Sequence, residues 1–473
     1  MFYKFKRIFS VALVLVLVFS LAGCSKPVDD GSSVEWIVEE EIITVGGSSS
    51  DEESTVSTDN TQQQSNNQST LENSSTTETN NGINLEKLRG TTVKFAGTSY
   101  FDHKESGPVV EAFEEKYGIN VEVVLVDGGD YPNQIAGLIA AGQSPDCTRS
   151  NGDFPACMGF LQSLDAAKID YNDPIWDQNM FELTTFGDSP YLCNTVGNVY
   201  AETDIVVYRK DILQRASCRT PEEYDKQGKW TWDAFFDIAR QCKSSVDGVE
   251  GCAFASADNA LHMAGGAVFK LENGKFVSGI NDKTASIMTK FAEAWKEGII
   301  SWHSTDGIVN GTTAIITVHS YALRKSGAFE NDDWTNLGFY TLPNFDENTP
   351  ATPTGIFRGW GIIRGAENPV GAGLFLRYYL DSSNYDTANT YISPEAETFF
   401  FKVTSFDYGE WNPYFTYLAH SEKIAGIDYS ADIYNAMYND PNQVSVKMSS
   451  IRSYVEMGCE NLNDYIEKNI GLQ

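Results

Sequence analysis

The sequence GNVYAETDIVVYRKDIL (residues 197–213), followed after a loop by KWTWDAFFDIAR (residues 229–240), decides the fold. Residues 200–208 form a short alternating and apolar run with Ile205, Val206 and Val207 at its centre, and such a run after a polar turn predicts a strand buried on both faces. Thr231 stands at the N-cap position of the second part, Asp233 lies in the first turn, and apolar residues then recur at helical spacing. The stretch therefore predicts a strand, a loop and an amphipathic helix.

Strand and helix patterns also alternate upstream of this stretch. Residues 93–96 and 119–126 predict strands, and the apolar spacing of residues 108–116 predicts a helix between them. The next helical pattern, residues 131–141, ends at Gly142, a residue typical of helix C-termini. This order of elements indicates an α/β fold that opens with a parallel sheet.

Short motifs in a fixed order carry a family resemblance. Besides the opening stretch, they are VVEAFEEKYGINVEVV (109–124), SPDC (144–147), IVNGTTAII (308–316), LGFYTLP (337–343) and RGAENPVGAGLFLRYYL (364–380). Their order resembles the sugar-type extracellular solute-binding proteins of ABC importers, the family that includes maltose-binding protein. Tyr208-Arg209-Lys210 stands where that family usually has Tyr-Asn-Lys, and the resemblance weakens after Tyr385.

The resemblance implies an α/β, two-lobe fold of the periplasmic-binding-protein type (type II), with a hinge and a cleft between the lobes. The expected parts are a signal peptide at 1–23, a lipidated cysteine and tether at 24–85, a first lobe at 86–203 plus about 358–400, and a second lobe at 204–357 plus about 401–473. The chain is expected to cross between the lobes at residues 201–205 and 358–362, and by a third strand.

The N-terminal residues have the pattern of a bacterial secretory signal. Three basic residues precede an apolar core at 8–19, which is short for a membrane span. Leu21-Ala22-Gly23-Cys24 resembles a lipobox, which implies that Cys24 carries the lipid at the outer face of the bacterial cytoplasmic membrane. The alternative is a cleaved signal with an incidental cysteine. The polar residues 25–84 predict a solvated tether with a reach of roughly 40–45 Å.

Composition narrows the possible functions. The formal charge is −31, from 34 basic and 65 acidic residues, which argues against nucleic-acid partners and against docking on anionic lipid. No G-x-S-x-G, H-E-x-x-H or Walker motif occurs, and the five histidines have no metal-ligand spacing. We therefore predict a binding protein with no enzymatic activity, no metal and no cofactor.

Seven cysteines remain besides Cys24, so at least one is unpaired if the protein is a monomer, which is the expected state. Cys242 and Cys252 make a plausible disulfide in an exported protein, and buried thiols are the alternative. No C-x-x-C spacing occurs, so a structural zinc site is not expected.

A hydroxyl-rich ligand needs flat aromatic surfaces and hydrogen-bonding side chains, and the chain has 9 Trp and 23 Tyr. Tyr100 and Phe101 follow the first predicted strand, at the carboxyl end of the sheet where open α/β folds bind ligands. The resemblance places sugar-binding acids at Asp153 and Glu202. Core packing for the rings, and a solvated surface position for the acids, are the alternatives.

Three further aromatic residues are candidates. The resemblance places a cleft aromatic at Tyr321, Trp360 lies in the return crossover beside Arg358, and Trp411 is a loop aromatic in the tail. The full set of expected ligand-binding residues is Tyr100, Phe101, Asp153, Glu202, Tyr321, Trp360 and Trp411.

The resemblance implies a lipid-anchored receptor that binds a mono- or oligosaccharide between its lobes and delivers it to the permease subunits of an ABC transporter. The alternatives are the same fold with a peptide or polyamine as solute, an extracellular carbohydrate-active enzyme, and an adhesion protein.

Overall fold

The computed structural model describes most of the chain from Thr79 onward. The described residues are 79–80, 83–98, 106–127, 130–150, 154, 156–195, 203–254, 257–265, 269–272, 274–302, 305–325, 329, 334–356, 358–385, 391–404, 412–414, 435–436, 438 and 440–471. The predicted signal, Cys24 and nearly all of the predicted tether lie outside these residues, as do Tyr100, Phe101, Asp153, Glu202 and Trp411.

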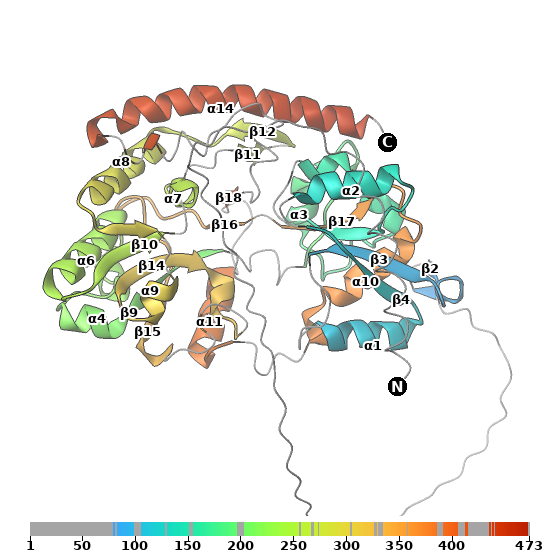
Figure 1. Cartoon of the computed structure of the whole chain (residues 1–473), viewed down its shortest axis with the longest axis horizontal. Coiled ribbons are helices and arrows are strands. Elements are labelled where there is room, and N and C mark those ends of the chain that lie inside the picture. The colour runs from blue at the N-terminus through green and yellow to red at the C-terminus, as the bar shows by residue number, and fades with distance from the viewer. Residues whose placement is uncertain are drawn as a thin grey trace, which may run out of the picture. The chain divides into compact units, whose positions relative to one another are not determined.

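A five-stranded sheet forms the first α/β body. Figure 1 labels its strands β3, β4 and β17. Its strand order is β4-β3-β5-β17-β6, with β3 (Thr92–Gly97), β4 (Asn120–Leu125), β5 (Cys147–Arg149), β6 (Leu161–Gln162) and β17 (Trp360–Ile363). Strand β3 runs parallel to β4 and β5, and β17 runs antiparallel to β5 and β6. Helices α1 (Gly107–Tyr117) and α10 (Pro369–Tyr379) contact each other, and α10 packs on β3 and β17.

A second five-stranded sheet has the order β13-β10-β14-β9-β15. Its strands are β9 (Asp204–Arg209), β10 (Glu250–Phe254), β13 (Ile300–Trp302), β14 (Thr313–His319) and β15 (Leu337–Tyr340). Strand β10 is parallel to β13 and β14, whereas β9 runs antiparallel to β14 and β15. Residues 204–208 of β9 are all buried, which confirms the prediction of a strand buried on both faces.

Helix α6 (Trp232–Ser245) is the predicted amphipathic helix after β9. Its buried face includes Trp232 and Phe235, and the Trp232 ring centroid lies 4.9 Å from that of Phe291. Thr231 is at the N-cap as predicted, but its side chain accepts no hydrogen bond from the helix. The start of α6 is instead held by a backbone hydrogen bond, in which Trp232 N donates to Asn344 O at 3.3 Å.

The remaining helices and short strands complete the architecture. The helices are α2 (Tyr131–Ala140), α3 (Gln178–Leu183), α4 (Lys210–Arg215), α5 (Pro221–Asp225), α7 (Ala257–Met263), α8 (Asp282–Lys296), α9 (Thr305–Val309), α11 (Pro394–Thr404) and α14 (Pro441–Ile470). The short strands are β1 (Thr79–Asn80), β2 (Ile83–Asn84), β7 (Thr185–Phe186), β8 (Ser189–Pro190), β11 (Phe269–Glu272), β12 (Lys275–Ser278), β16 (Thr354–Ile356) and β18 (Asn412–Tyr414).

The segments that connect the two sheets pair with one another. Thr203, immediately before β9, forms an antiparallel bridge with Gly355 of β16, and β16 pairs in parallel with β18. Thr203 lies within the range 201–205 in which the outgoing crossing is predicted. Gly355, the partner of Thr203 in the returning chain, lies slightly before the range 358–362 in which the return crossing is predicted.

The C-terminal elements contact parts of both α/β bodies. Buried residues of α11, Ala396 and Phe400, pack in one cluster with Ile205 and Ile316 of the second sheet, although a first-lobe position was expected up to about residue 400. Helix α14 contacts α8 and β12 (Figure 1). Tyr465 of this helix donates its hydroxyl to Ala156 O at 3.1 Å.

All seven cysteines of the described residues are free thiols, so the expected Cys242–Cys252 disulfide is wrong. The Cys242 Sγ lies 3.6 Å from the Cys218 Sγ. Cys252 sits in β10, where its Sγ donates to Ile299 O at 3.4 Å. The face of α6 that carries Cys242 therefore meets the turn after α4, which holds Cys218.

Asp146 of the SPDC motif joins three parts of the first body. Its buried carboxylate accepts hydrogen bonds from the backbone N–H of Lys94 in β3 at 2.8 Å and of Asn368 at 2.6 Å. Asn368 in turn caps α10, because its Oδ1 accepts from Gly371 N at 3.1 Å. One carboxylate thus fixes β3 and the start of α10 relative to β5.

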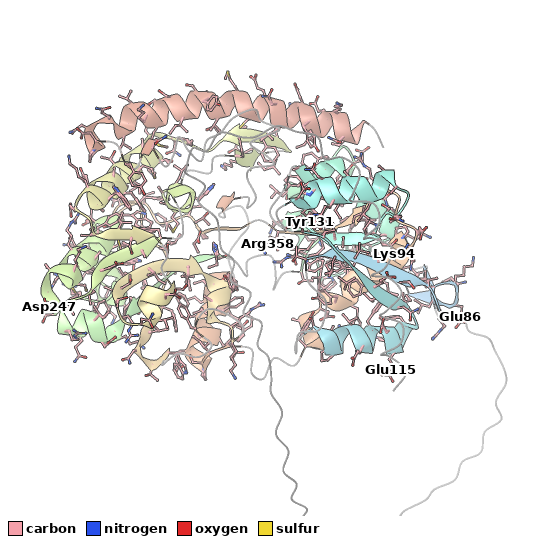
Figure 2. The ribbon with its side chains drawn as sticks, viewed as in Figure 1. Glu86, Lys94, Glu115, Tyr131, Asp247 and Arg358 are labelled. Atoms are coloured by element: carbon pink, nitrogen blue, oxygen red, sulfur yellow. The ribbon has the colours of Figure 1, made fainter. Side chains whose placement is uncertain are left out.

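Replacing Asp146 by alanine should lower the free energy of unfolding by about 2–4 kcal/mol, because two buried N–H groups lose their acceptor. Asp146→Asn keeps one acceptor oxygen and should lose less. The exposed Asp247→Ala, at the residue labelled in Figure 2, is the matched control and should change stability by less than about 0.5 kcal/mol. Urea denaturation measures all three, and equal losses for Asp146→Ala and Asp247→Ala would contradict this role.

Candidate functional site

The carboxyl ends of strands β3 and β5 in the first sheet lie beside the segment by which the chain returns from the second sheet. Strand β3 ends at Gly97, and β5 ends at Arg149, directly opposite Trp360 at the start of β17. Ser150 joins the end of β5 to the residue before β17, since its N–H donates to Gly359 O at 2.7 Å and its Oγ accepts from Gly359 N at 3.1 Å. Open α/β sheets bind ligands outside this end of their strands.

In the second sheet, the carboxyl end of β14 lies beside Thr203, the residue before β9. Strand β14 ends at His319, opposite Asp204 at the start of β9, and His319 Nδ1 lies 3.0 Å from Asp204 Oδ1. Ser320 N donates to Thr203 O at 2.7 Å. The start of β9, with Thr203 before it, and the segment after β14 are therefore held together by backbone and side-chain contacts.

Tyr321, which the sequence predicts as a cleft aromatic, lies at this edge of the second sheet. It lies in the short 3-10 helix η6 (Ser320–Leu323), directly after the residue bonded to Thr203. Its side chain is 45% exposed, and its ring centroid lies 6.1 Å from the imidazole of His319. A large aromatic ring is thus available to solvent beside the crossing strand, where a flat apolar face of a ligand can stack on it.

Trp360 occupies a different environment. Its ring lies 5.5 Å from those of Phe95 and Tyr379, and only 9% of the residue is exposed. The indole thus belongs to the hydrophobic cluster of the first sheet. A ligand role for Trp360 stays a prediction, and packing of this edge is what the observed contacts support.

Arg358 lies between β16 and β17, on the returning segment (Figure 2). Its backbone oxygen accepts from Asn194 Nδ2 at 3.1 Å, and Asn194 O accepts from Asp177 N. The last described residues before the outgoing crossing therefore hold the returning chain. A guanidinium at this position suits recognition of hydroxyl or carboxylate oxygens.

Five predicted residues cannot be compared directly with these contacts. Tyr100, Phe101, Asp153, Glu202 and Trp411 lie outside the described residues. Described residues within three positions of them in the chain include Thr98, Ser150, Thr203 and Asn412, each of which begins a strand or lies directly beside one.

The Asp204–His319 pair was not among the sequence predictions. Asp204 was recognisable as the residue after the predicted crossing, and His319 as the end of a predicted strand. Their contact depends on the antiparallel register of β9 and β14, which the residue pattern does not specify.

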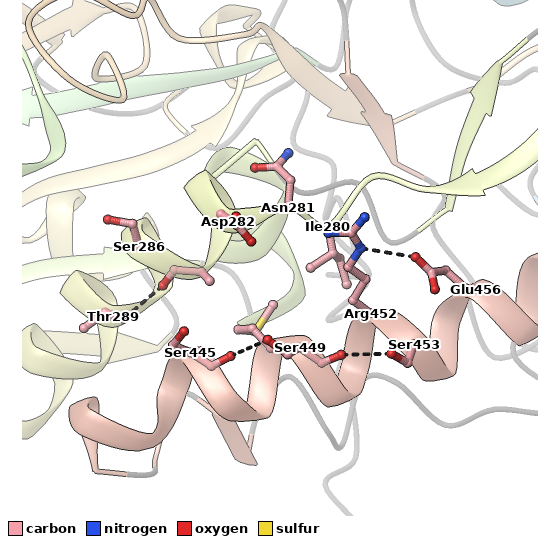
Figure 3. A pocket seen from close by; sticks show the side chains of 12 residues that line it. Ile280, Asn281, Asp282, Ser286, Thr289, Ser445, Ser449, Arg452, Ser453 and Glu456 are labelled. Atoms are coloured by element: carbon pink, nitrogen blue, oxygen red, sulfur yellow. Dashed lines mark hydrogen bonds and ion pairs between the residues drawn. The ribbon is translucent and has the colours of Figure 1, made fainter.

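Two surface hollows lie away from these edges. One of about 510 Å³ runs between α8 and α14 (Figure 3), and one of about 230 Å³ includes Lys116, Trp176 and Arg377. The first has no aromatic residue in its wall, and Ser449 and Ser453 donate their hydroxyls to carbonyls of the preceding helical turn. Its walls therefore lack a stacking surface for a sugar.

His262 is the buried titratable group of α7, the helix that follows β10. Complete burial lowers the pKa of His262 to about 3, because the interior disfavours the charged imidazolium. No group of three or more His, Cys, Asp or Glu side chains in the described residues is arranged to hold a metal.

The sequence model of the bacterial extracellular solute-binding proteins matches residues 104–385, more than half of the chain. The chain belongs to this family. The match covers α1 to α10 and includes both crossings described above.

Solved structures share the fold of this solute-binding protein. They include a galacto-N-biose/lacto-N-biose I-binding protein of an ABC transporter from Bifidobacterium longum in complex with lacto-N-biose (TM-score 0.57, 13% identity, covering 79% of this chain and 98% of that chain). An ABC substrate-binding protein from Listeria monocytogenes in complex with cycloalternan is also similar (TM-score 0.51, 15% identity, 80% and 99%). A third is an extracellular solute-binding protein from Staphylococcus aureus in complex with maltose (TM-score 0.51, 13% identity, 81% and 99%). No sequence match to a curated protein was found.

These findings confirm the two-lobe, periplasmic-binding-protein-like fold and the family that the motifs predicted. The solute-binding protein acts outside the cytoplasm, as its family description states. None of the helices in the described ranges has both the length and the apolarity that a bilayer crossing requires.

Acidification should destabilise the protein through His262. As pH falls from about 6.5 toward about 3, the unfolded chain takes up a proton on this residue and the folded chain does not, so stability is lost across that window. Between about pH 7 and about pH 4.5, His262→Leu should lose about 2–3 kcal/mol less unfolding free energy than the unchanged protein. Denaturant titrations at both pH values measure this, with Met263→Leu as the neighbouring buried control. Parallel losses for the unchanged protein and His262→Leu would contradict the assignment.

Proposed function

We propose that this solute-binding protein captures a mono- or oligosaccharide between its two lobes and delivers it to the permease of an ABC transporter. The observation that carries the proposal is the exposed ring of Tyr321, placed beside the crossing strand by the Ser320–Thr203 hydrogen bond. Three structural neighbours were solved with carbohydrates bound, which adds support for a sugar as the ligand class.

The energetics of such binding are modest. A micromolar ligand needs about 8 kcal/mol in total, and each net hydrogen bond contributes about 0.5–1.5 kcal/mol. An aromatic pair adds about 0.5–1.5 kcal/mol beyond the area that it buries, which indicates the scale expected for stacking on Tyr321. Several hydrogen bonds from Arg358, Asp153 and Glu202, together with stacking on rings such as Tyr321, would supply this binding free energy.

Ligand that touches both lobes would favour the closed arrangement, because only that arrangement makes both sets of contacts. Rotation would take place at the connecting segments, where Thr203, β16 and β18 lie. The closed form then presents the surface that the permease recognises. In this proposal Cys24 carries the lipid, residues 25–84 form the tether, the protein is a monomer, and no chemical turnover accompanies binding.

A thermal-shift screen over mono- and oligosaccharides tests the proposal. A true ligand at about 100–1,000 times its Kd should raise the unfolding free energy by about 2.7–4.1 kcal/mol. Tyr321→Ala should weaken that ligand about five- to tenfold by removing the stacked ring, and Glu202→Ala should weaken it by removing an acceptor. Phe401→Ala is the control, because this ring on α11 is 51% exposed and lies outside the proposed site.

The screen also separates the alternatives. Stabilisation by peptides or polyamines but by no sugar would keep the fold and replace the ligand class. Release of smaller sugars from an added glycan would show an enzyme, and the absence of any stabilising solute would favour an adhesion protein. A sugar that binds equally well to Tyr321→Ala and Glu202→Ala would disprove the residue placement while leaving the ligand class intact.

A further inference from the structure

The turn after α4 carries a cysteine that faces a second cysteine on α6. Cys218 Sγ and Cys242 Sγ lie 3.6 Å apart, although 24 residues separate them in the chain. Cys242 is buried, whereas Cys218 is only partly buried. Each of the other five thiols in the described residues is buried.

Neighbouring groups hold this turn against α6. Gln241, next to Cys242, donates its Nε2 to Ala216 O at 2.9 Å and to Ser217 O at 3.2 Å. Ser217 has the left-handed backbone angle φ of 55°, and Cys218 N donates to Leu213 O at 2.9 Å. Hydrogen bonds from Gln241 and to Leu213 therefore hold the backbone of residues 216–218 beside Cys242.

We propose that Cys218 and Cys242 form a redox-active thiol pair that closes to a disulfide outside the cytoplasm. The sulfurs need to approach from 3.6 Å to about 2.0 Å, a shift within reach of side-chain rotation on the surface turn. Disulfides form and persist in the extracytoplasmic space, where members of this family act. The oxidant is a protein disulfide of a thiol–disulfide oxidoreductase.

The reaction proceeds by two thiolate attacks. The Cys218 thiolate attacks one sulfur of the oxidant's disulfide, forms a mixed disulfide and releases one thiolate of the oxidant. The Cys242 thiolate then attacks the Cys218 sulfur, forms the intramolecular bond and releases the second thiolate. The protein gives up two electrons, and the protons of both its thiols end on the two thiols of the reduced oxidant.

Accessibility and acidity assign the order of the two attacks. Cys218 is the thiol that solvent reaches, and the hydrogen bond from Cys242 lowers the pKa of Cys218 below its usual value. The same hydrogen bond, together with burial, raises the pKa of Cys242. Cys218 is therefore the entering nucleophile, and Cys242 is the resolving thiol.

Peptide mapping after oxidation tests the pair directly. The folded, full-length protein is treated with glutathione disulfide, remaining thiols are blocked, and the chain is cut after glutamate. The peptides 203–222, 224–250 and 251–272 then contain Cys218, Cys242 and Cys252 separately. We expect 203–222 to be joined to 224–250, with a loss of two free thiols per chain. A link between 224–250 and 251–272, or no link with both thiols still blockable, would overturn the proposal.

Single substitutions test the order of attack. Cys242→Ser should accumulate glutathione on Cys218, because the resolving thiol is missing, and Cys218→Ser should accumulate none, because Cys242 is buried. Cys252→Ser is the control and should form the 203–222 to 224–250 link like the unchanged protein. Glutathione on Cys242 in the Cys218→Ser variant would refute the order. The mapping of the unchanged protein decides the pairing even if a variant fails to fold.

Discussion

Backbone hydrogen bonding at Thr203 is the constraint on which the arrangement of the candidate site depends. This one residue pairs with Gly355 of the returning chain and accepts from Ser320 N, while the next residue begins β9. The outgoing crossing, the returning crossing and the segment that carries Tyr321 are therefore fixed relative to one another. In the proposed closure, a rotation at this junction would move the Tyr321 ring together with β9.

Much of the fold follows from local patterns because burial imposes them. The apolar run of β9 is buried along residues 204–208, and the face of α6 predicted from its spacing is the one that packs. The same reasoning fails where the outcome depends on register or long-range approach. Cys242 has the nearer sequence neighbour in Cys252, but its Sγ contacts that of Cys218, and the Cys252 Sγ donates to Ile299 O. Sequence distance therefore does not show which thiols meet.

The site shows the same division between local and long-range information. The motif predicts Tyr321 as a cleft aromatic, and its ring is exposed directly after the residue that bonds Thr203; its ligand role stays a prediction. Trp360 was chosen for its position in the returning chain, but the pattern could not show that Phe95 and Tyr379 cover its ring. The Asp204–His319 contact required a strand register that no single-sequence pattern supplies. Positions at strand ends can thus be predicted, whereas the direction and partners of each side chain cannot.

Strand β9 is held firmly along its whole length. Tyr208, near the far end of β9, donates its hydroxyl to both carboxylate oxygens of Glu222, at 2.9 and 2.8 Å. Its ring lies against Gly338 of β15, where a Cβ would overlap it, so glycine is what allows this close packing. One end of β9 is thus held by these contacts, and its body is buried between β14 and β15. Bending β9 would break buried contacts along its length, so in the proposed closure the rotation falls on the connecting segments and β9 moves as a unit.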